Sequence, residues 1–121
     1  MNKYYTPEAG ELTIGMEVEL LHSTNGWVKY INPDIKPLDA NSLKEGVRVK
    51  CLDREDIESL GYGIIQDEHN CQWFKNANGN IEIGLENDYH LTIRFTQSFV
   101  LFSGTIKNKS ELINQLKRCG I

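Results

Sequence analysis

The sequence lacks any apolar run long enough to cross a membrane, and its first residues, MNKYYTPEAGELTIG, lack the apolar stretch of a secretory signal peptide. It has only three cysteines, Cys51, Cys71 and Cys119, and they are widely spaced with no CxxC pair. An odd number of scattered cysteines argues against a disulfide framework. We therefore expect a cytoplasmic protein with reduced thiols and no membrane association.

Basic residues are also fewer than acidic ones. The 121 residues include 13 Lys and Arg against 17 Asp and Glu, for a formal net charge of −4. Proteins that bind nucleic acids usually present a basic face, so DNA and RNA are disfavoured as partners. The apolar share of 40% and the charged share of 25% are ordinary for a globular protein. This length and composition predict a single α+β domain over residues 1–121, with no cofactor needed to build its core.

An N-terminal β-hairpin is predicted from two alternating segments, residues 14–21 and the return segment WVKYI at 27–31. Pairing them around the turn at 23–26 sets Leu20 opposite Val28 and matches acidic with basic side chains. The segment that follows, 32–46, contains two prolines and little pattern. We expect it to be a long connection, which could also serve as a binding segment.

The stretch VKCLDREDIESLGY, residues 49–62, gathers four carboxylates within a few positions. Asp53 is placed to cap the first turn of a helix, and Glu55 and Asp56 fall where the helix dipole favours negative charge. Gly61 is placed to end the helix in the left-handed conformation. We interpret the stretch as a short helix, 53–60, because a calcium loop needs oxygens at alternating positions around a glycine bend.

From residue 71 onward the pattern predicts an antiparallel meander over about 71–106. Asn78-Gly79 indicates a type I′ turn, which sets Phe74 opposite Ile83 and lays Trp73 over Gly84. For the next pair of strands we expect a three-residue connection at 86–88, with Ile83 opposite Leu91.

Residues 99–106 are apolar on both faces, which is typical of a central strand or of a strand covered on both faces, although their register is not defined by the pattern. The last segment, KSELINQLKRCGI at 109–121, predicts an amphipathic helix with Ser110 at its N-cap. We expect this helix to pack on the meander, which gives an α+β fold.

The segment DEHNC, residues 67–71, is the best local candidate for chemistry. On one strand, His69 and Cys71 would point the same way with Asp67 in line, so they could ligate a metal or form a thiol–imidazole pair. The alternative is a polar loop before a strand, in which these residues are turn formers. We favour the loop, assign no catalytic residue and no metal site, and expect no enzyme.

Four residues of the expected meander form a candidate binding surface, namely Trp73, Lys75, His90 and Arg94. They should share the face that the C-terminal helix leaves uncovered. Trp and Arg are over-represented at binding hot spots. The alternatives are a solvated face on which Trp73 merely covers a glycine, or a face packed on the N-terminal hairpin.

Three blocks of the sequence resemble small proteins encoded by phages and prophages of Bacteroides-like gut bacteria: YYTPEAGELTIGMEVEL at 4–20, VRVKCLDREDIESLGY at 47–62 and FSGTIKNKSELINQLKRCGI at 102–121. That family has no assigned activity, so the resemblance carries over no functional residue. It implies a viral or mobile-element accessory protein in a bacterial cytoplasm, where such proteins often bind a host protein.

Two functional hypotheses follow. The first is a non-enzymatic accessory protein that binds, and modulates, a protein of the host. The second is a small-molecule or nucleotide-binding domain, in which Trp73 or Tyr62 stacks on the ligand and Arg94 pairs with an anion. A free sheet edge could also form a homodimer by strand addition.

Overall fold

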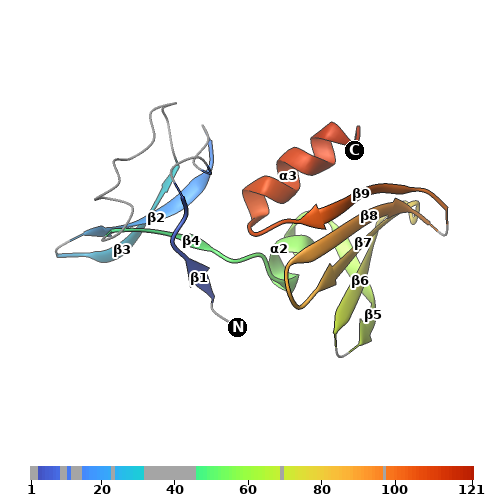
Figure 1. Cartoon of the computed structure of the whole chain (residues 1–121), viewed down its shortest axis with the longest axis horizontal. Coiled ribbons are helices and arrows are strands. Elements are labelled where there is room, and N and C mark those ends of the chain that lie inside the picture. Colours follow the sequence, from blue (N-terminus) through green and yellow to red (C-terminus); the bar gives the residue numbers. More distant parts are fainter. Residues whose placement is uncertain are drawn as a thin grey trace. The chain divides into compact units, whose positions relative to one another are not determined.

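The chain is described here by a computed structural model (Figure 1). The structure describes residues 3–8, 11, 15–22, 24–31, 46–68, 70–96 and 98–121. The chain divides into two compact units, Met1–Cys51 and Leu52–Ile121. The expectation of a single domain over residues 1–121 stays a prediction. Within the described residues, no helix combines the length and the apolar character that crossing a membrane requires.

The described residues of the first unit form a four-stranded sheet. Its order is β1 (Tyr4–Tyr5), β4 (Val47–Lys50), β2 (Glu17–His22) and β3 (Gly26–Ile31). The predicted hairpin register is confirmed, since Leu20 lies opposite Val28 and Glu19 opposite Lys29. A small apolar cluster supports the sheet, made of Met16, Val18, Val47 and Val49.

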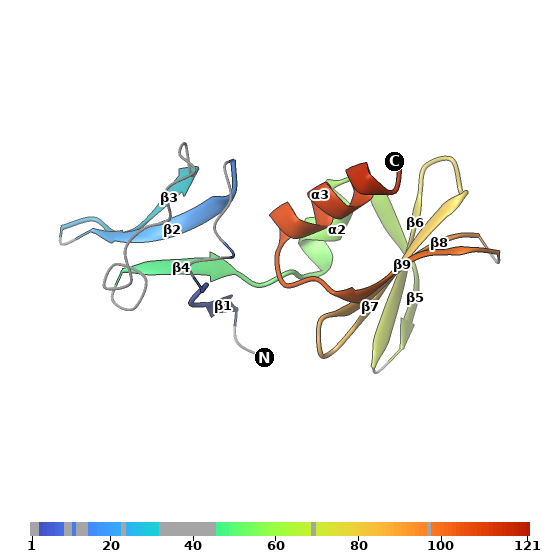
Figure 2. The same cartoon turned by 45° about the horizontal axis from the view of Figure 1, so that its top comes forward.

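The second unit is a five-stranded antiparallel meander with two described helices (Figure 2). Its elements are α2 (Arg54–Ser59), β5 (Tyr62–Glu68), β6 (Cys71–Asn76), β7 (Ile81–Glu86), β8 (His90–Phe95), β9 (Val100–Thr105) and α3 (Lys109–Arg118). The α+β class with a meander sheet and a C-terminal helix is confirmed. The sheet begins earlier than predicted, because the polar residues before 71 belong to the additional strand β5.

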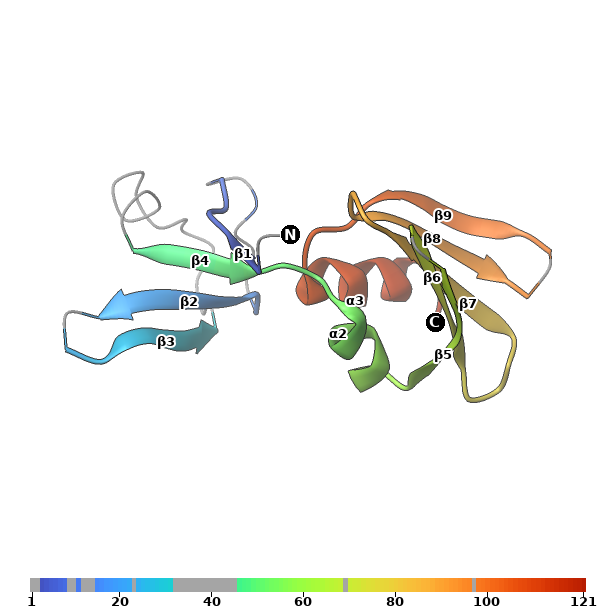
Figure 3. The ribbon, with the colours of Figure 1, turned by 90° about the horizontal axis from the view of Figure 1, so that it is seen from below.

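Both helices of this unit pack on one face of the meander (Figure 3). Ile57 of α2 and Leu112 of α3 belong to the same buried cluster as Phe74 of β6 and Ile83 of β7. All four side chains are fully buried. The packing of the C-terminal helix on the sheet is therefore as predicted.

The acidic stretch forms a capped helix. The side chain of Asp53 accepts a hydrogen bond from the backbone N–H of Asp56 at 3.0 Å, and the Asp56 carboxylate accepts one from the N–H of Asp53 at 3.3 Å. Gly61 follows the helix with φ of +95°. These contacts confirm the predicted helix start and stop.

The predicted cap of the C-terminal helix is wrong. The helix begins at Lys109 and its N-cap is Asn108, not Ser110. The buried Asn108 side chain accepts a hydrogen bond from the backbone N–H of Glu111 at 2.9 Å. Asn108 at the N-cap satisfies the backbone N–H of Glu111. A cap at Ser110, two residues later, would leave that N–H to the solvent.

The β6–β7 register is confirmed, with Phe74 opposite Ile83 and Trp73 opposite Gly84. The predicted type I′ turn is wrong, because that turn requires positive φ at both central residues and Asn78 does not have it. Instead, Gly79 takes φ of +76° and its N–H donates to the carbonyl of Asn76. Oδ1 of Asn76 accepts hydrogen bonds from the backbone N–H groups of Asn80 and Ile81. These contacts stabilise a loop longer than two residues, and the β6–β7 register is unchanged.

The predicted β7–β8 register is wrong by two residues. Ile83 lies opposite Ile93, not Leu91, and the three-residue connection spans 87–89. Tyr89 closes this connection with φ of 64° and donates its N–H to the carbonyl of Glu86. The observed register sets Glu82 opposite Arg94, which the pattern of apolar residues alone does not indicate.

The prediction that residues 99–106 form a central strand, or a strand covered on both faces, is also wrong. β9 is an edge strand, paired only with β8 in the described sheet. Its register shifts between Ile93 and Arg94 of the neighbouring strand, so that Arg94 faces Val100. Apolar side chains on both faces of this strand therefore reach the solvent in part.

Candidate functional site

The candidate binding residues lie on the face of the meander opposite the helices. Phe74 and Ile93 point into the core, so their neighbours Trp73, Lys75 and Arg94 point away from it, because side chains alternate along a strand. His90 lies on the same face by the same alternation, at the other end of β8 from Arg94. We call this the outer face.

Trp73 and Arg94 are in direct contact. The guanidinium carbon of Arg94 lies 4.0 Å from the centroid of the Trp73 ring. The ring covers Gly84 so closely that a Cβ atom built there would lie 2.7 Å from it. The prediction of a tryptophan over a cross-strand glycine is confirmed, and the ring is held between the glycine backbone and the arginine.

The charge of Arg94 is already matched. Its Nε donates to Oε1 of Glu82 at 3.0 Å, and Glu82 is only 5% exposed. A buried carboxylate is stable only with such a partner. Arg94 therefore neutralises Glu82, so an external anion would have to compete with this buried carboxylate for the guanidinium. Lys75, opposite Glu82 on the neighbouring strand, is the second cation near this carboxylate.

Tyr62, the other group expected to stack on a ligand, is 5% exposed and belongs to the core cluster. Burial raises the pKa of its hydroxyl above the ordinary value. The expectation that Tyr62 could stack on a ligand is therefore wrong. His90 has a partner of its own, since its Nε2 lies 2.9 Å from the hydroxyl of Ser103.

The residues of the segment 67–71 do not lie on one strand. Asp67 is on β5 opposite Gln72, whereas Cys71 is on β6 and faces Glu68 across the hairpin. The hypothesis of one shared strand is therefore wrong. The favoured loop is confirmed only in part, because Asn70 lies in a turn whereas Asp67 and Glu68 belong to β5. His69 lies outside the described residues.

The Cys71 thiol is poorly suited to nucleophilic chemistry or metal binding. Burial raises its pKa, the nearby carboxylates of Glu86 and Glu68 raise it further, and Arg94 lowers it in part. The thiolate is the reactive and ligating form. The part of the chain that the structure describes contains no cluster of three or more His, Cys, Asp or Glu side chains arranged to hold a metal ion.

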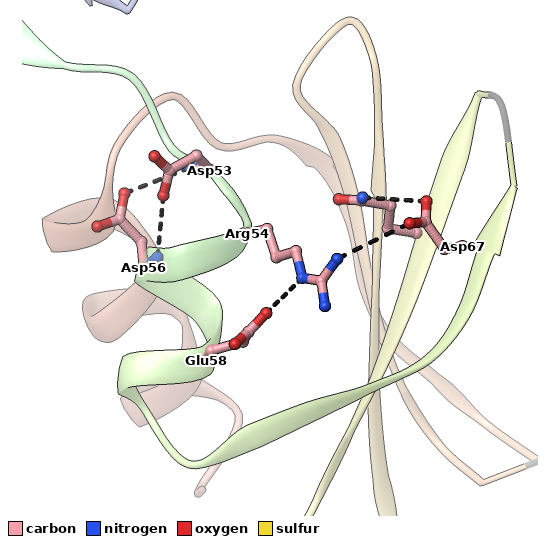
Figure 4. Close-up of polar contacts among 6 residues, drawn as sticks. Asp53, Arg54, Asp56, Glu58 and Asp67 are labelled. Carbon is pink, nitrogen blue, oxygen red and sulfur yellow. Dashed lines mark hydrogen bonds and ion pairs between the residues drawn. The ribbon is translucent and has the colours of Figure 1, made fainter.

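Asp67 takes part in a polar contact between helix and sheet (Figure 4). Arg54 of α2 is paired with Glu58 one turn later and reaches Oδ2 of Asp67 at 3.8 Å. Gln72 donates to Asp67 from the neighbouring strand at 3.1 Å. The acidic residues around α2 thus cap the helix or pair with Arg54, and they do not converge on a common centre.

One part of the outer face was missed by sequence reasoning. Val100, opposite Arg94, is 60% exposed on this face. The preceding Phe99 is 71% exposed, but the alternation of side chains directs it to the other face of the sheet. The available signal is the run that is apolar on both faces, a pattern that typically indicates a central strand. At a sheet edge, the same run presents large apolar side chains to the solvent.

A second aromatic–arginine cluster lies in the first unit. The guanidinium of Arg48 lies 3.7 Å from the Tyr4 ring centroid and 4.2 Å from that of Trp27. Its Nη2 donates to Oε1 of Glu19 at 2.9 Å. These residues come from four strands, so no local sequence signal identifies them as neighbours.

A scan against protein-family models, a search of curated proteins and a search of solved structures each returned no match to this chain. The resemblance to phage and prophage proteins, and the cytoplasmic location that it implies, stay predictions. The functional argument therefore rests on the chain's own surfaces.

Proposed function

We propose that this chain is a non-enzymatic accessory protein that binds another protein through the outer face of its five-stranded sheet. The observation that carries the proposal is the exposure of Val100 beside the Trp73–Arg94 pair. Tryptophan and arginine are enriched at binding hot spots, and exposed apolar side chains beside them are typical of an interaction site. Both described helices of this unit pack on the other face, so within this unit no described helix covers the outer face.

The Trp73–Arg94 pair supports binding because it is ordered before any partner arrives. The ring rests on Gly84, and the guanidinium is held by both the ring and Glu82. A partner that packs on this surface loses little side-chain entropy. The exposed Val100 then extends the surface with apolar area that gains from being removed from water.

The resemblance to phage and prophage proteins suggests the kind of partner. We propose a protein of the bacterial host, bound in the cytoplasm, whose activity the complex modulates. The net charge of −4 supports a protein partner over nucleic acid.

A small-molecule or nucleotide-binding domain remains the alternative. It is weaker because Tyr62 is in the core and Arg94 is paired with Glu82. A nucleotide or metabolite that raises the melting temperature of the purified chain would favour this alternative.

A capture experiment with matched variants tests the proposal. The tagged chain is incubated with lysate of a Bacteroides-like host, beside a Val100→Lys variant. The control is Ile65→Ser, which removes an apolar side chain that is 52% exposed on β5, at the opposite edge of the sheet. Thermal unfolding first verifies that all three chains fold.

The wild-type chain and the control should recover the same dominant protein. The Val100→Lys variant should recover it about tenfold less, since burying an unpaired ammonium group in the interface costs more than about 1.4 kcal/mol. Recovery of no dominant protein, or equal recovery by all three chains, would contradict the proposal.

A further inference from the structure

The strand β3 forms one edge of the first sheet, and its construction differs from that of the other long edges. Among the described residues, no strand pairs with its outer side. The two edges of the meander are interrupted by register shifts, at Ile64/Gln66 of β5 and beside β9. Such irregularities protect edges from pairing with other chains. β3 pairs with β2 over six consecutive positions without a shift.

The side chains of β3 do not discourage strand addition either. Four of them are large, apolar and exposed, with one charge in the middle at Lys29. These four are Trp27, Val28, Tyr30 and Ile31. A regular, apolar and exposed edge is the kind that pairs with another strand.

The backbone groups available for pairing can be assigned. The N–H of Leu21 on β2 donates to the carbonyl of Gly46, on the β4 side. Because backbone groups alternate in direction along an antiparallel strand, the even-numbered residues of β2 face β3. Their partners on β3 are even-numbered too, so the backbone groups of Trp27, Lys29 and Ile31 point outward.

We propose that β3 pairs with β3 of a second copy of this chain, antiparallel about a two-fold axis at Val28. This interface lies in the first unit, so it is independent of the function proposed for the outer face. Trp27 then lies opposite the partner's Lys29, and both residues direct their backbone groups across the interface. Gly26 lies opposite the partner's Tyr30.

The strand is complementary to itself in this register. An ammonium group against a tryptophan ring is a favourable cation–π pair. Tyr30 over the partner's Gly26 repeats the arrangement that Trp73 makes over Gly84 in the second unit. The register centred on Lys29 would instead set two like charges opposite each other, which is destabilising.

A second copy is favoured over an extended segment of another protein because β3 itself contains both members of each cross-strand pair, Trp27 with Lys29 and Tyr30 with Gly26. One added strand on each side buries less than the roughly 1,600 Å² of a standard stable interface. We therefore expect a monomer–dimer equilibrium that depends on concentration.

The full-length chain tests the proposal in two ways. Sedimentation velocity should show the wild-type mass doubling as the concentration rises. Lys29→Pro should remain monomeric, because proline removes an outward N–H and is tolerated on the edge side of a strand. A wild-type chain that stays monomeric throughout would overturn the proposal, and capture of another protein's strand at this edge would then identify the other occupant.

Disulfide trapping tests the register without depending on the proline variant. Val28→Cys places two thiols across the axis, in a pair whose Cα atoms are about 4.5 Å apart and within disulfide reach. Lys29→Cys is the control, since the proposed register sets it opposite a tryptophan. Under oxidised glutathione, Val28→Cys should form linked dimers roughly tenfold faster than the control or the wild type. Equal rates would overturn the proposed pairing.

Discussion

Arg94 and Arg54 of the second unit both contact carboxylates, but the two contacts differ in burial and therefore in their contribution to stability. Arg94 neutralises the buried Glu82 and stacks on a tryptophan ring, so it is part of the outer-face structure. Arg54 pairs with Glu58 on the surface of α2, where solvent screens the attraction. The same residue types thus give a structural requirement in one place and a minor contact in the other.

The reactivity of the Cys71 thiol tests the hypothesis of an enzyme built on His69 and Cys71. Burial and two carboxylates raise the pKa of the thiol, so less thiolate exists at pH 8 than in an ordinary cysteine. We expect iodoacetamide to modify Cys71 of the folded chain at least about fivefold more slowly than in urea. The difference should narrow as the pH rises through the raised pKa. Mass spectrometry of the labelled peptides measures both rates.

The wild-type chain in urea supplies the reference rate for this comparison. Labelling of Cys71 that is faster in the folded chain at neutral pH would reveal an activated thiol. That result would contradict the expectation and restore the hypothesis of an enzyme built on His69 and Cys71.

At the scale of elements, the contact between β6 and β7 depends on the absence of a side chain at residue 84. A Cβ there would lie 2.7 Å from the Trp73 ring, which Arg94 and Glu82 hold in place. We expect Gly84→Ala to lower the free energy of unfolding by about 1–3 kcal/mol, as overpacking does elsewhere. Urea denaturation measures the change.

Gly63→Ala is the matched control, since it lies on β5 of the same sheet and a Cβ there meets nothing within 4 Å. Its effect should stay within about 0.5 kcal/mol. Similar losses for both variants would show that strand glycines, and not the tryptophan contact, account for the effect.

At the scale of the whole molecule, the two compact units differ in what they bury. The second unit has a cluster that draws on both helices and on the sheet, whereas the cluster in the described part of the first unit is smaller, namely Met16, Val18, Val47 and Val49. Burial of apolar surface is the main favourable contribution to folding. We expect a fragment of residues 52–121 to fold alone and a fragment of residues 1–51 to remain unfolded.

Circular dichroism in urea checks both fragments. The fragment 52–121 should show one cooperative transition with the spectrum of a mixed α and β protein. The absence of a transition in that fragment, or a cooperative transition in 1–51, would contradict this division of stability.

Much of the candidate site was predictable, because alternation along a strand is a local property. It placed Trp73, Lys75, His90 and Arg94 on one face, and the Asn-Gly signal gave the register of Trp73 over Gly84. The burial of Glu82 was not predictable. It depends on a β7–β8 register that competing apolar pairings leave open.

Local sequence patterns are sufficient to define the capped helix α2, the first hairpin and the β6–β7 pairing. Each depends on residues a few positions apart, whose spacing alone defines the hydrogen bonds and contacts. Only the tertiary structure decided that β9 is an edge, that Arg94 is matched by Glu82 and that β3 keeps a regular open side. These features depend on which distant strands become neighbours, and the sum of many weak packing contacts decides that.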